Sequence, residues 1–290
     1  MSDEHHIRNP FEYGLEQMAT GVSDASQAIR AGLHPAAAQP APAIRQISTG
    51  DLWDALVKGF GDLGAYRADL FFIGVVYPVA GLVLARLAYG HSLLPLVFPL
   101  ASGFALIGPV AAVGLYEISR RRERGASPSW TDAFGVVRSP AFGSIVALGL
   151  LLVGIFLLWL GAAYAIFLAT VGPQPPASVA AFGREVLGTS AGWAMIGVGT
   201  GVGFLFAVLA LAISVVSFPL LLDRHVGVGA AIATSVRAVA ANPGPMAVWG
   251  MVVVGGLLIG SLPVLAGLVV VVPLLGHATW HLYRKVVAPA

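Results

Sequence analysis

The sequence predicts an all-α protein, a polytopic transmembrane bundle of about six spans with three amphipathic helices on the cytoplasmic surface of the membrane. Of its 290 residues, 57% are hydrophobic and only 10% are charged, whereas soluble proteins average about 25% charged residues. Several apolar runs reach the roughly 20 residues that cross a bilayer. Glycine is abundant at 36 residues, as expected where membrane helices pack closely.

The chain divides into a tail and a membrane domain. Residues 1–43 are polar and end in the Pro/Ala-rich stretch HPAAAQPAPA, so we expect a disordered cytoplasmic tail and linker. They contain no apolar core of the signal-peptide type, and the first span is expected to direct insertion. Residues 44–287 form the predicted six-span transmembrane domain.

Apolar runs place the six spans. The predicted spans are 70–88, 93–118, 141–170, 193–222, 246–261 and 263–283. The last two come from one nearly unbroken apolar stretch, which as a single helix would be about 57 Å long, against a hydrocarbon core of about 30 Å. The stretch must therefore turn back, and Gly260-Ser261-Leu262-Pro263 holds turn-forming residues. The first arm is short, so a partial or re-entrant span over 246–261 is the alternative.

The distribution of cations predicts the orientation, because Lys and Arg are retained in cytoplasmic loops. With six spans, all but two of the 16 Lys and Arg residues fall on one side of the membrane. Only Arg86 and Arg184 fall on the other side. Both termini are therefore predicted to be cytoplasmic.

An amphipathic segment precedes each odd-numbered span. The three segments are residues 48–63, 129–140 and 227–243. The first two begin with a Ser and an Asp at capping-box spacing, Ser48 with Asp51 and Ser129 with Asp132. The layout indicates a threefold repeat of one interfacial helix and two spans. Repeats of this kind often bind or pass a substrate at their interface.

Four stretches carry a family resemblance: IRQISTGDLWDALVKGFGDL (44–63), FPLASGFALIGPVAAVGLYEISRRRERGASPSWTDAF (98–134), FPLLLDRHVGVGAAIATSVRAVAANPGPM (218–246) and GHATWHLYRKVV (276–287). Together they resemble the bacterial integral-membrane family called domain of unknown function 2189, over about residues 44–287. The resemblance implies a bacterial inner-membrane helical protein with no settled activity. Some members have carried a label relating them to a cytochrome oxidase subunit. A haem–copper centre needs several histidines inside the spans, and the predicted spans have no mid-membrane His.

The end of the last span holds the first candidate site. His277, Trp280, His281 and Arg284 lie at i, i+3, i+4 and i+7, on one helical face. Two histidines four apart can ligate one metal, but the zinc-protease motif also needs Glu where Ala278 stands. If the even-numbered spans converge, their ends form one candidate polar cluster: Glu117, Asp223, His225, His277 and His281.

Several interpretations of this end remain open. The cluster could be a site for a proton or substrate, or for a metal or haem. It could also be a structural network in which Glu117 or Asp223 pairs with Arg120, Arg224 or Arg284. Finally, it could be a membrane-edge belt, with these anchors: Tyr116, Trp280, Tyr283, Arg284 and Lys285.

The function we expect is non-enzymatic binding or passage of a small molecule, ion or lipid. Prolines in every even-numbered span (Pro95, Pro99, Pro109, Pro219 and Pro273) predict bent helices that could border a cavity. The alternative is an accessory or assembly subunit of a respiratory-type membrane complex, ligating a metal or haem through His277 or His281. A membrane enzyme is a third class, but the sequence shows no nucleophile–base pair and no complete metal motif.

Composition and these patterns also bound the cofactors and partners. The chain has no Cys, which excludes disulfides, thiolate catalysis and Cys-ligated metals. No cofactor is predicted. The expected partners are the lipid bilayer, an unknown small molecule or lipid, and a second copy or a membrane complex, with no nucleic acid.

Overall fold

The computed structural model of the protein describes residues 42–65, 81–82, 86, 94–174, 176, 178–224, 226–263 and 266–289. Within these residues the regular structure is helical, which confirms the all-α prediction. The one β-type pairing among these described residues is an isolated antiparallel bridge between Ile44 and Val287. The helices are α2 (Thr49–Ala65), η1 (Leu94–Leu96), α4 (Val97–Ala111), α5 (Val113–Glu123), η2 (Trp130–Arg138), α6 (Phe142–Thr170), α7 (Val179–Gly188), α8 (Ser190–Ser214), α9 (Ser217–Asp223), α10 (Val228–Ala241), α11 (Pro243–Ser261) and α12 (Leu268–Val286).

Three described helices are long and apolar enough to cross a membrane: Phe142–Thr170, Ser190–Asp223 and Pro243–Ser261. They coincide with the predicted spans at 141–170, 193–222 and 246–261. The predicted span at 70–88 lies almost wholly outside the described residues. The predicted span at 93–118 is interrupted at Ala112, after Pro109, and the chain continues as α5 to Glu123. Six spans therefore remain a prediction.

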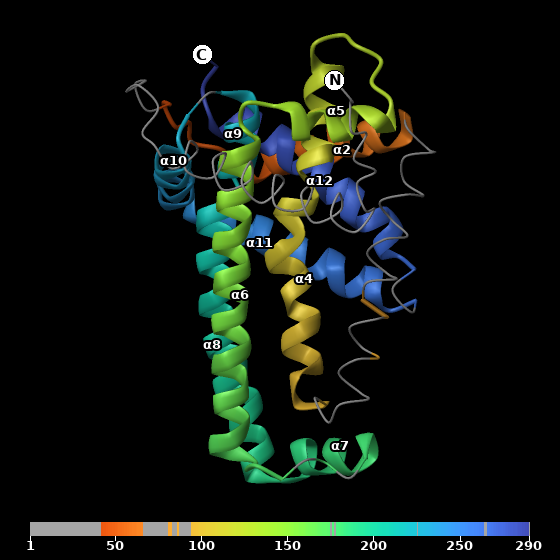
Figure 1. Cartoon of the computed structure of the whole chain (residues 1–290), viewed down its shortest axis with the longest axis vertical. Helices are drawn as coiled ribbons and strands as arrows, with labels where there is room; N and C mark the ends of the chain where they lie inside the picture. The colour runs from red at the N-terminus through yellow and green to blue at the C-terminus, as the bar shows by residue number, and fades with distance from the viewer. Residues whose placement is uncertain are drawn as a thin grey trace, which may run out of the picture.

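Figure 1 shows how these helices are arranged. Helices α6 and α8 run side by side along the length of the molecule, with α4 next to them, and α7 crosses one end. We call the opposite end the polar end; it holds α2, α5, η2, α9, α10 and the last turns of α12 (Figure 1). Arg184 lies on α7, whereas the cations of α2, α5, η2, α10 and α12 lie at the polar end.

The last two helices form a hairpin that turns where the sequence predicts. Helix α11 ends at Ser261 and α12 begins at Leu268. Gly260 and Gly267 allow the arms to meet, because a Cβ added at Gly267 would lie 2.8 Å from the Cα of Gly260. Figure 1 shows both arms running obliquely and stopping short of α7. This course fits the partial span that the sequence leaves open for 246–261.

The three amphipathic segments are helical, as predicted, and each packs on the end of an even-numbered predicted span. Helix α2 contacts α12, η2 contacts α5, and α10 contacts α8 and α9. The segment η2 is a 3-10 helix rather than an α-helix. Both predicted capping boxes form: the Ser48 backbone N–H donates to Asp51 Oδ2 at 2.9 Å, and that of Ser129 to Asp132 Oδ2 at 2.7 Å. The threefold repeat itself remains a prediction.

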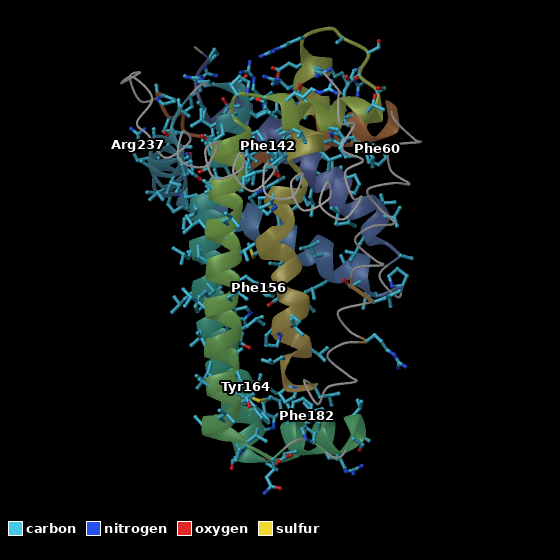
Figure 2. The ribbon with its side chains drawn as sticks, viewed as in Figure 1. Phe60, Phe142, Phe156, Tyr164, Phe182 and Arg237 are labelled. Atoms are coloured by element: carbon cyan, nitrogen blue, oxygen red, sulfur yellow. The ribbon has the colours of Figure 1, made fainter. Side chains whose placement is uncertain are left out.

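Apolar side chains cover the outside of the long helices between the two ends. Figure 2 labels Phe156 in this middle zone, Tyr164 and Phe182 near α7, and Arg237 at the polar end. On α6, Leu157 and Leu158 are 59% and 67% exposed. Surfaces of this kind are stable when lipid hydrocarbon covers them.

Candidate polar site at the ends of three helices

The ends of the even-numbered spans converge, as the candidate cluster requires. Helices α5, α9 and α12 all touch one another at the polar end. Arg120 of α5 donates from Nη1 to the Leu222 carbonyl oxygen of α9 at 2.9 Å. Tyr283 of α12 donates its hydroxyl proton to Asp223 Oδ2 at 2.7 Å. The free carbonyls at the end of α9 thereby receive a cation, which the helix dipole favours.

Helix α2 joins this junction through a close backbone approach. Leu52, Ala55 and Gly59 lie on the face of α2 that is buried. A Cβ at Gly59 would lie only 2.7 Å from the backbone nitrogen of Ala278 on α12. The absence of a side chain at this position lets the two helices touch, and it carries Asp62, one turn further along α2, to the side chains of α12.

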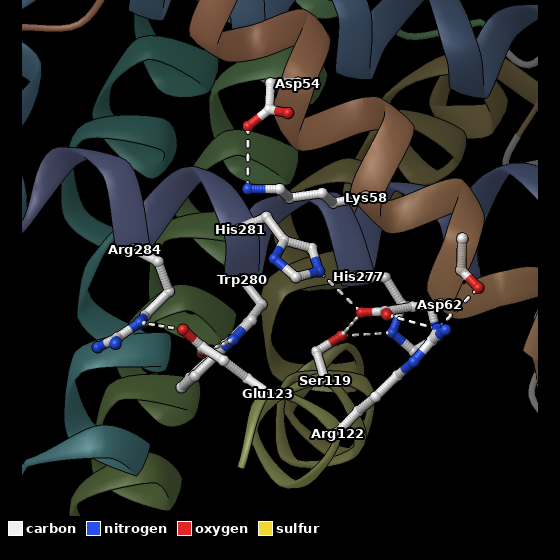
Figure 3. A network of polar contacts seen from close by, with 11 residues as sticks. Asp54, Lys58, Asp62, Ser119, Arg122, Glu123, His277, Trp280, His281 and Arg284 are labelled. Atoms are coloured by element: carbon white, nitrogen blue, oxygen red, sulfur yellow. Dashed lines mark hydrogen bonds and ion pairs between the residues drawn. The ribbon is translucent and has the colours of Figure 1, made fainter. Parts of the chain in front are cut away.

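Asp62 is the centre of a buried hydrogen-bonded chain of four side chains, shown in Figure 3. Its Oδ2 accepts from the Ser119 hydroxyl at 2.6 Å and lies 2.8 Å from Nε2 of His281. Ser119 Oγ also lies 2.8 Å from Nδ1 of His277. We call His277, Ser119, Asp62 and His281 the relay. Asp62, Ser119 and His277 are 5%, 1% and 3% exposed.

Proton positions in the relay follow from its donors and acceptors. A hydroxyl has one proton, and Ser119 gives it to Asp62. Nδ1 of His277 must then donate to Ser119, which fixes the tautomer of the neutral His277 ring. An ionised carboxylate only accepts, so Nε2 of His281 carries a proton toward Asp62.

Neighbouring side chains stabilise the negative charge of Asp62. Arg122 of α5 donates from Nη1 to Asp62 Oδ1 at 2.7 Å. Burial raises the pKa of Asp62, but the hydrogen bonds from His281 and Ser119, and the positive charge of the two histidines when they are protonated, lower it more, so the net pKa lies below the ordinary value. The carboxylate is therefore ionised at neutral pH although it is buried.

Glu117 does not join the histidines, because two arginines of its own helix bind it. Its Oε1 accepts from Nε of Arg121 at 2.7 Å, and its Oε2 accepts from Nε of Arg120 at 2.8 Å. The two partners are four and three residues further along α5, within reach on one helical face. Glu117 thus forms the structural pair that the sequence offers as one alternative.

Asp223 and the two basic anchors connect the helices. Arg284 donates from Nε to Glu123 Oε1 at 3.0 Å, and its Nη1 lies 3.4 Å from Asp223 Oδ2. Lys285 lies 3.0 Å from Asp51 and 2.7 Å from Asp54, both on α2. His225 lies outside the described residues. The five residues of the candidate cluster are thus divided, and only His277 and His281 share the relay.

The aromatic anchors require a correction. As a membrane-edge belt, Tyr116, Trp280 and Tyr283 would face lipid headgroups, but their side chains are 2%, 0% and 1% exposed. They are buried because α5, α9 and α12 converge around them. Trp280 donates from Nε1 to Glu123 Oε2 at 3.1 Å. The exposed aromatic residues at this end include Trp53 and Phe60 of α2, at 70% and 64%.

Sequence reasoning missed the relay residues Asp62 and Ser119, and Arg122 beside them. A signal for Asp62 was present. It shares the helical face of Leu52, Ala55 and Gly59, and a carboxylate on a buried face requires partners. For Ser119 no sequence signal separates it from other serines.

The described residues limit the chemistry of this site. Among them, no group of three His, Cys, Asp or Glu side chains could hold a metal ion. Ser119 donates directly to Asp62 and meets His277 through Nδ1, whereas a triad serine donates to a histidine that the acid orients. What the relay can do is exchange protons, because each member is a hydrogen-bond donor or acceptor of the next.

Comparison with protein families found a match over the middle of the chain. Residues 97–223 match the model of a family described as predicted integral membrane protein (DUF2189). The resemblance is confirmed over this segment. The match contains α4 to α9, including Glu117, Ser119 and Asp223, whereas α2 and α12 lie outside it. No curated protein and no solved structure matched the chain.

Over less than half of its length the chain is similar to this family, whose description names an integral membrane protein and no activity. The apolar helices of the structure agree with that description. Neither finding specifies a ligand or reaction, so the function has to be argued from the site.

Proposed function

We propose that this protein is a non-enzymatic membrane protein that binds a small ion at the polar end, and that the ion is the proton held by the relay. The observation that carries the proposal is Asp62, a buried carboxylate that accepts from both Ser119 and His281. Ionisable groups buried in a membrane protein are costly, so their presence argues for a function.

The relay has an inner end and an outer end. His277 is buried at the inner end, while His281 lines a pocket at the outer end. A proton arriving at His281 forms an imidazolium whose Nε2–H is hydrogen-bonded to the Asp62 carboxylate, while Ser119 keeps its proton and His277 keeps the one on Nδ1. No covalent bond inside the relay breaks in this step, so the relay gains or loses its proton only at His281, beside the pocket.

The membrane setting of this proposal follows from the charges. Arg122, Arg284 and Lys285 gather at the polar end, which supports a cytoplasmic location in a bacterial inner membrane. The pocket would then exchange protons with the cytoplasm. Exposed leucines of α6 and α8 would contact lipid.

A proton-uptake titration tests the proposal. The full chain in nanodiscs is titrated from pH 8 to pH 5, and the protons bound per molecule are counted for the wild type, Asp62→Asn and Asp54→Asn. Asp62→Asn should bind about one proton fewer, because a positive charge on His281 next to Arg122 would lose the carboxylate that balances it.

Asp54→Asn is the matched control, since Asp54 lies on the same helix and forms an ion pair with Lys58. The Asp54 side chain is 42% exposed. This variant should titrate as the wild type does in this range. Equal curves for the wild type and Asp62→Asn, with both proteins folded, would refute the proposal and leave the relay a structural network.

A further inference from the structure

A pocket of about 410 Å³ opens at the polar end beside the relay. It lies between the segment before α2, α2 itself, the end of α5 and the last turns of α12. Its lining residues are Arg45, Gln46, Ile47, Asp51, Lys58, Glu123, His281, Arg284 and Lys285. Its size is within the range of about 300–1,000 Å³ that small-molecule sites occupy.

The lining carries a surplus of positive charge. Four of the lining residues are cations, two are carboxylates, and His281 is the remaining titratable residue. Arg45 is exposed, lines the pocket and makes no ion pair with another described residue, so its guanidinium can accept a ligand. Lys285 and Arg284 already have carboxylate partners, at 3.0 Å from Asp51 and 3.0 Å from Glu123. An anion that binds here would share Lys285 with Asp51 and Arg284 with Glu123.

The shape of the charge favours a phosphate. A guanidinium offers parallel N–H donors that match two phosphate oxygens, and an ammonium adds a point charge. Arg45 supplies a guanidinium and Lys285 supplies an ammonium, and both residues line the pocket. His281 adds an imidazole that can donate to a third oxygen when it is protonated.

The neighbouring surface of α2 indicates where such a ligand would come from. Trp53, Val57 and Phe60 are 70%, 51% and 64% exposed on the side of α2 away from its buried face. An apolar, aromatic stripe on a helix of this kind lies at headgroup depth. Basic pockets at that depth on the cytoplasmic side bind anionic headgroups.

We propose that this pocket binds a phosphate-bearing anion, presented either by an anionic lipid headgroup or by a free phosphate monoester. The site goes beyond proton binding by the relay and does not depend on it. The pocket and the relay share only His281. An anion bound in the pocket would therefore lie beside the histidine that is hydrogen-bonded to Asp62.

The test uses the full chain in nanodiscs of phosphatidylcholine, with or without phosphatidic acid. Glycerol 3-phosphate binding is measured by calorimetry in the neutral nanodiscs, and retained phosphatidic acid is counted by native mass spectrometry from the mixed ones. Arg45→Gln and Arg45→Gln/Lys285→Gln are compared with Arg138→Gln/Arg237→Gln, which removes two cations of the polar end that do not line the pocket.

Binding of glycerol 3-phosphate that the pocket variants weaken at least about tenfold, and the control pair leaves unchanged, supports a free phosphate ligand. Retention of phosphatidic acid alone, with the same pattern among variants, supports a lipid headgroup. Equal losses in the pocket and control pairs would show surface electrostatics only and would overturn the proposal. Absence of binding by either ligand would overturn it as well.

Two features of the variant set keep the result interpretable. Lys285 also pairs with α2, so the double variant can loosen the fold, whereas Arg45→Gln removes no ion pair with a described residue. Arg45 lies outside the relay, so Arg45→Gln should weaken anion binding and leave proton uptake intact. The two proposals therefore fail separately.

Discussion

The contact between α2 and α12 can be tested with a single methyl group. In Gly59→Ala the added Cβ would lie 2.7 Å from the Ala278 backbone nitrogen and 2.8 Å from its Cα. Both are backbone atoms, so the clash cannot be relieved by rotating a flexible side chain. The helices must separate, and the separation moves Asp62 away from His281. Gly61 and Gly64 lie on the same helix, and a Cβ at either meets nothing within 4 Å.

The magnitude follows from two opposing effects. Replacing Gly by Ala inside a helix stabilises it by about 1 kcal/mol, and this gain applies at all three positions. Overpacking of a tight contact costs about 1–3 kcal/mol, and this cost applies only at Gly59. Gly61→Ala and Gly64→Ala should therefore be as stable as the wild type or up to about 1 kcal/mol more stable. Gly59→Ala should fall about 1–3 kcal/mol below them.

The assay is the free energy of unfolding of each variant in detergent, from SDS titration followed by circular dichroism. Comparing the three alanine variants with one another cancels the common helix-propensity gain. If Gly59→Ala were as stable as Gly61→Ala and Gly64→Ala, the close packing of α2 on α12 would be wrong, and the relay would lose the contact that assembles it.

Three further predictions concern the same end of the molecule. Asp62→Ala should lower the free energy of unfolding by about 3–5 kcal/mol, because it leaves buried donors and a guanidinium without their carboxylate, while Asp54→Ala should change it by less than about 1 kcal/mol; equal effects would contradict the burial of the relay. The Ser48 backbone N–H and the Lys285 ammonium lower the pKa of Asp51 to about 2, so its contribution is complete above the ordinary Asp value and is lost as the pH falls toward 2. The melting temperature should drop over that interval in the wild type and drop less in Asp51→Asn; parallel curves would refute the assignment. Asn242→Ala should cost about 1–3 kcal/mol in the same SDS titration, because this buried amide binds the backbone of the segment before α2 at 2.8 Å and 3.1 Å; an unchanged midpoint would show that the segment is held by other contacts.

Sequence patterns predicted the features that arise from local physics. The run of apolar residues gave the bounds of α6 within a residue at the N-terminus. Capping-box spacing predicted how α2 and η2 begin. The turn between α11 and α12 followed from the length of the apolar stretch and from Gly260 and Pro263. Each of these signals lies within a few residues of the feature that it predicts.

The parts that were missed depend on contacts between distant segments. The bond between Asp62 and His281 joins residues 219 positions apart, and it requires the Gly59–Ala278 approach, which no local pattern reveals. Glu117 was placed with the histidines because the ends of the spans were expected to meet. They do meet, but arginines one turn further along the same helix satisfy this carboxylate first.

The most direct test of the account is the nitrogen NMR spectrum of His277 and His281 in the full chain labelled with ¹⁵N-histidine, with His277→Gln and His281→Gln used to assign the two rings. We predict that neutral His277 carries its proton on Nδ1, that His281 carries one on Nε2, and that Asp62→Asn shifts the Nε2 resonance of His281, whose hydrogen-bond acceptor it changes. A His277 proton on Nε2, or an Nε2 resonance of His281 that does not respond to Asp62→Asn, would contradict a proton-binding relay at the polar end.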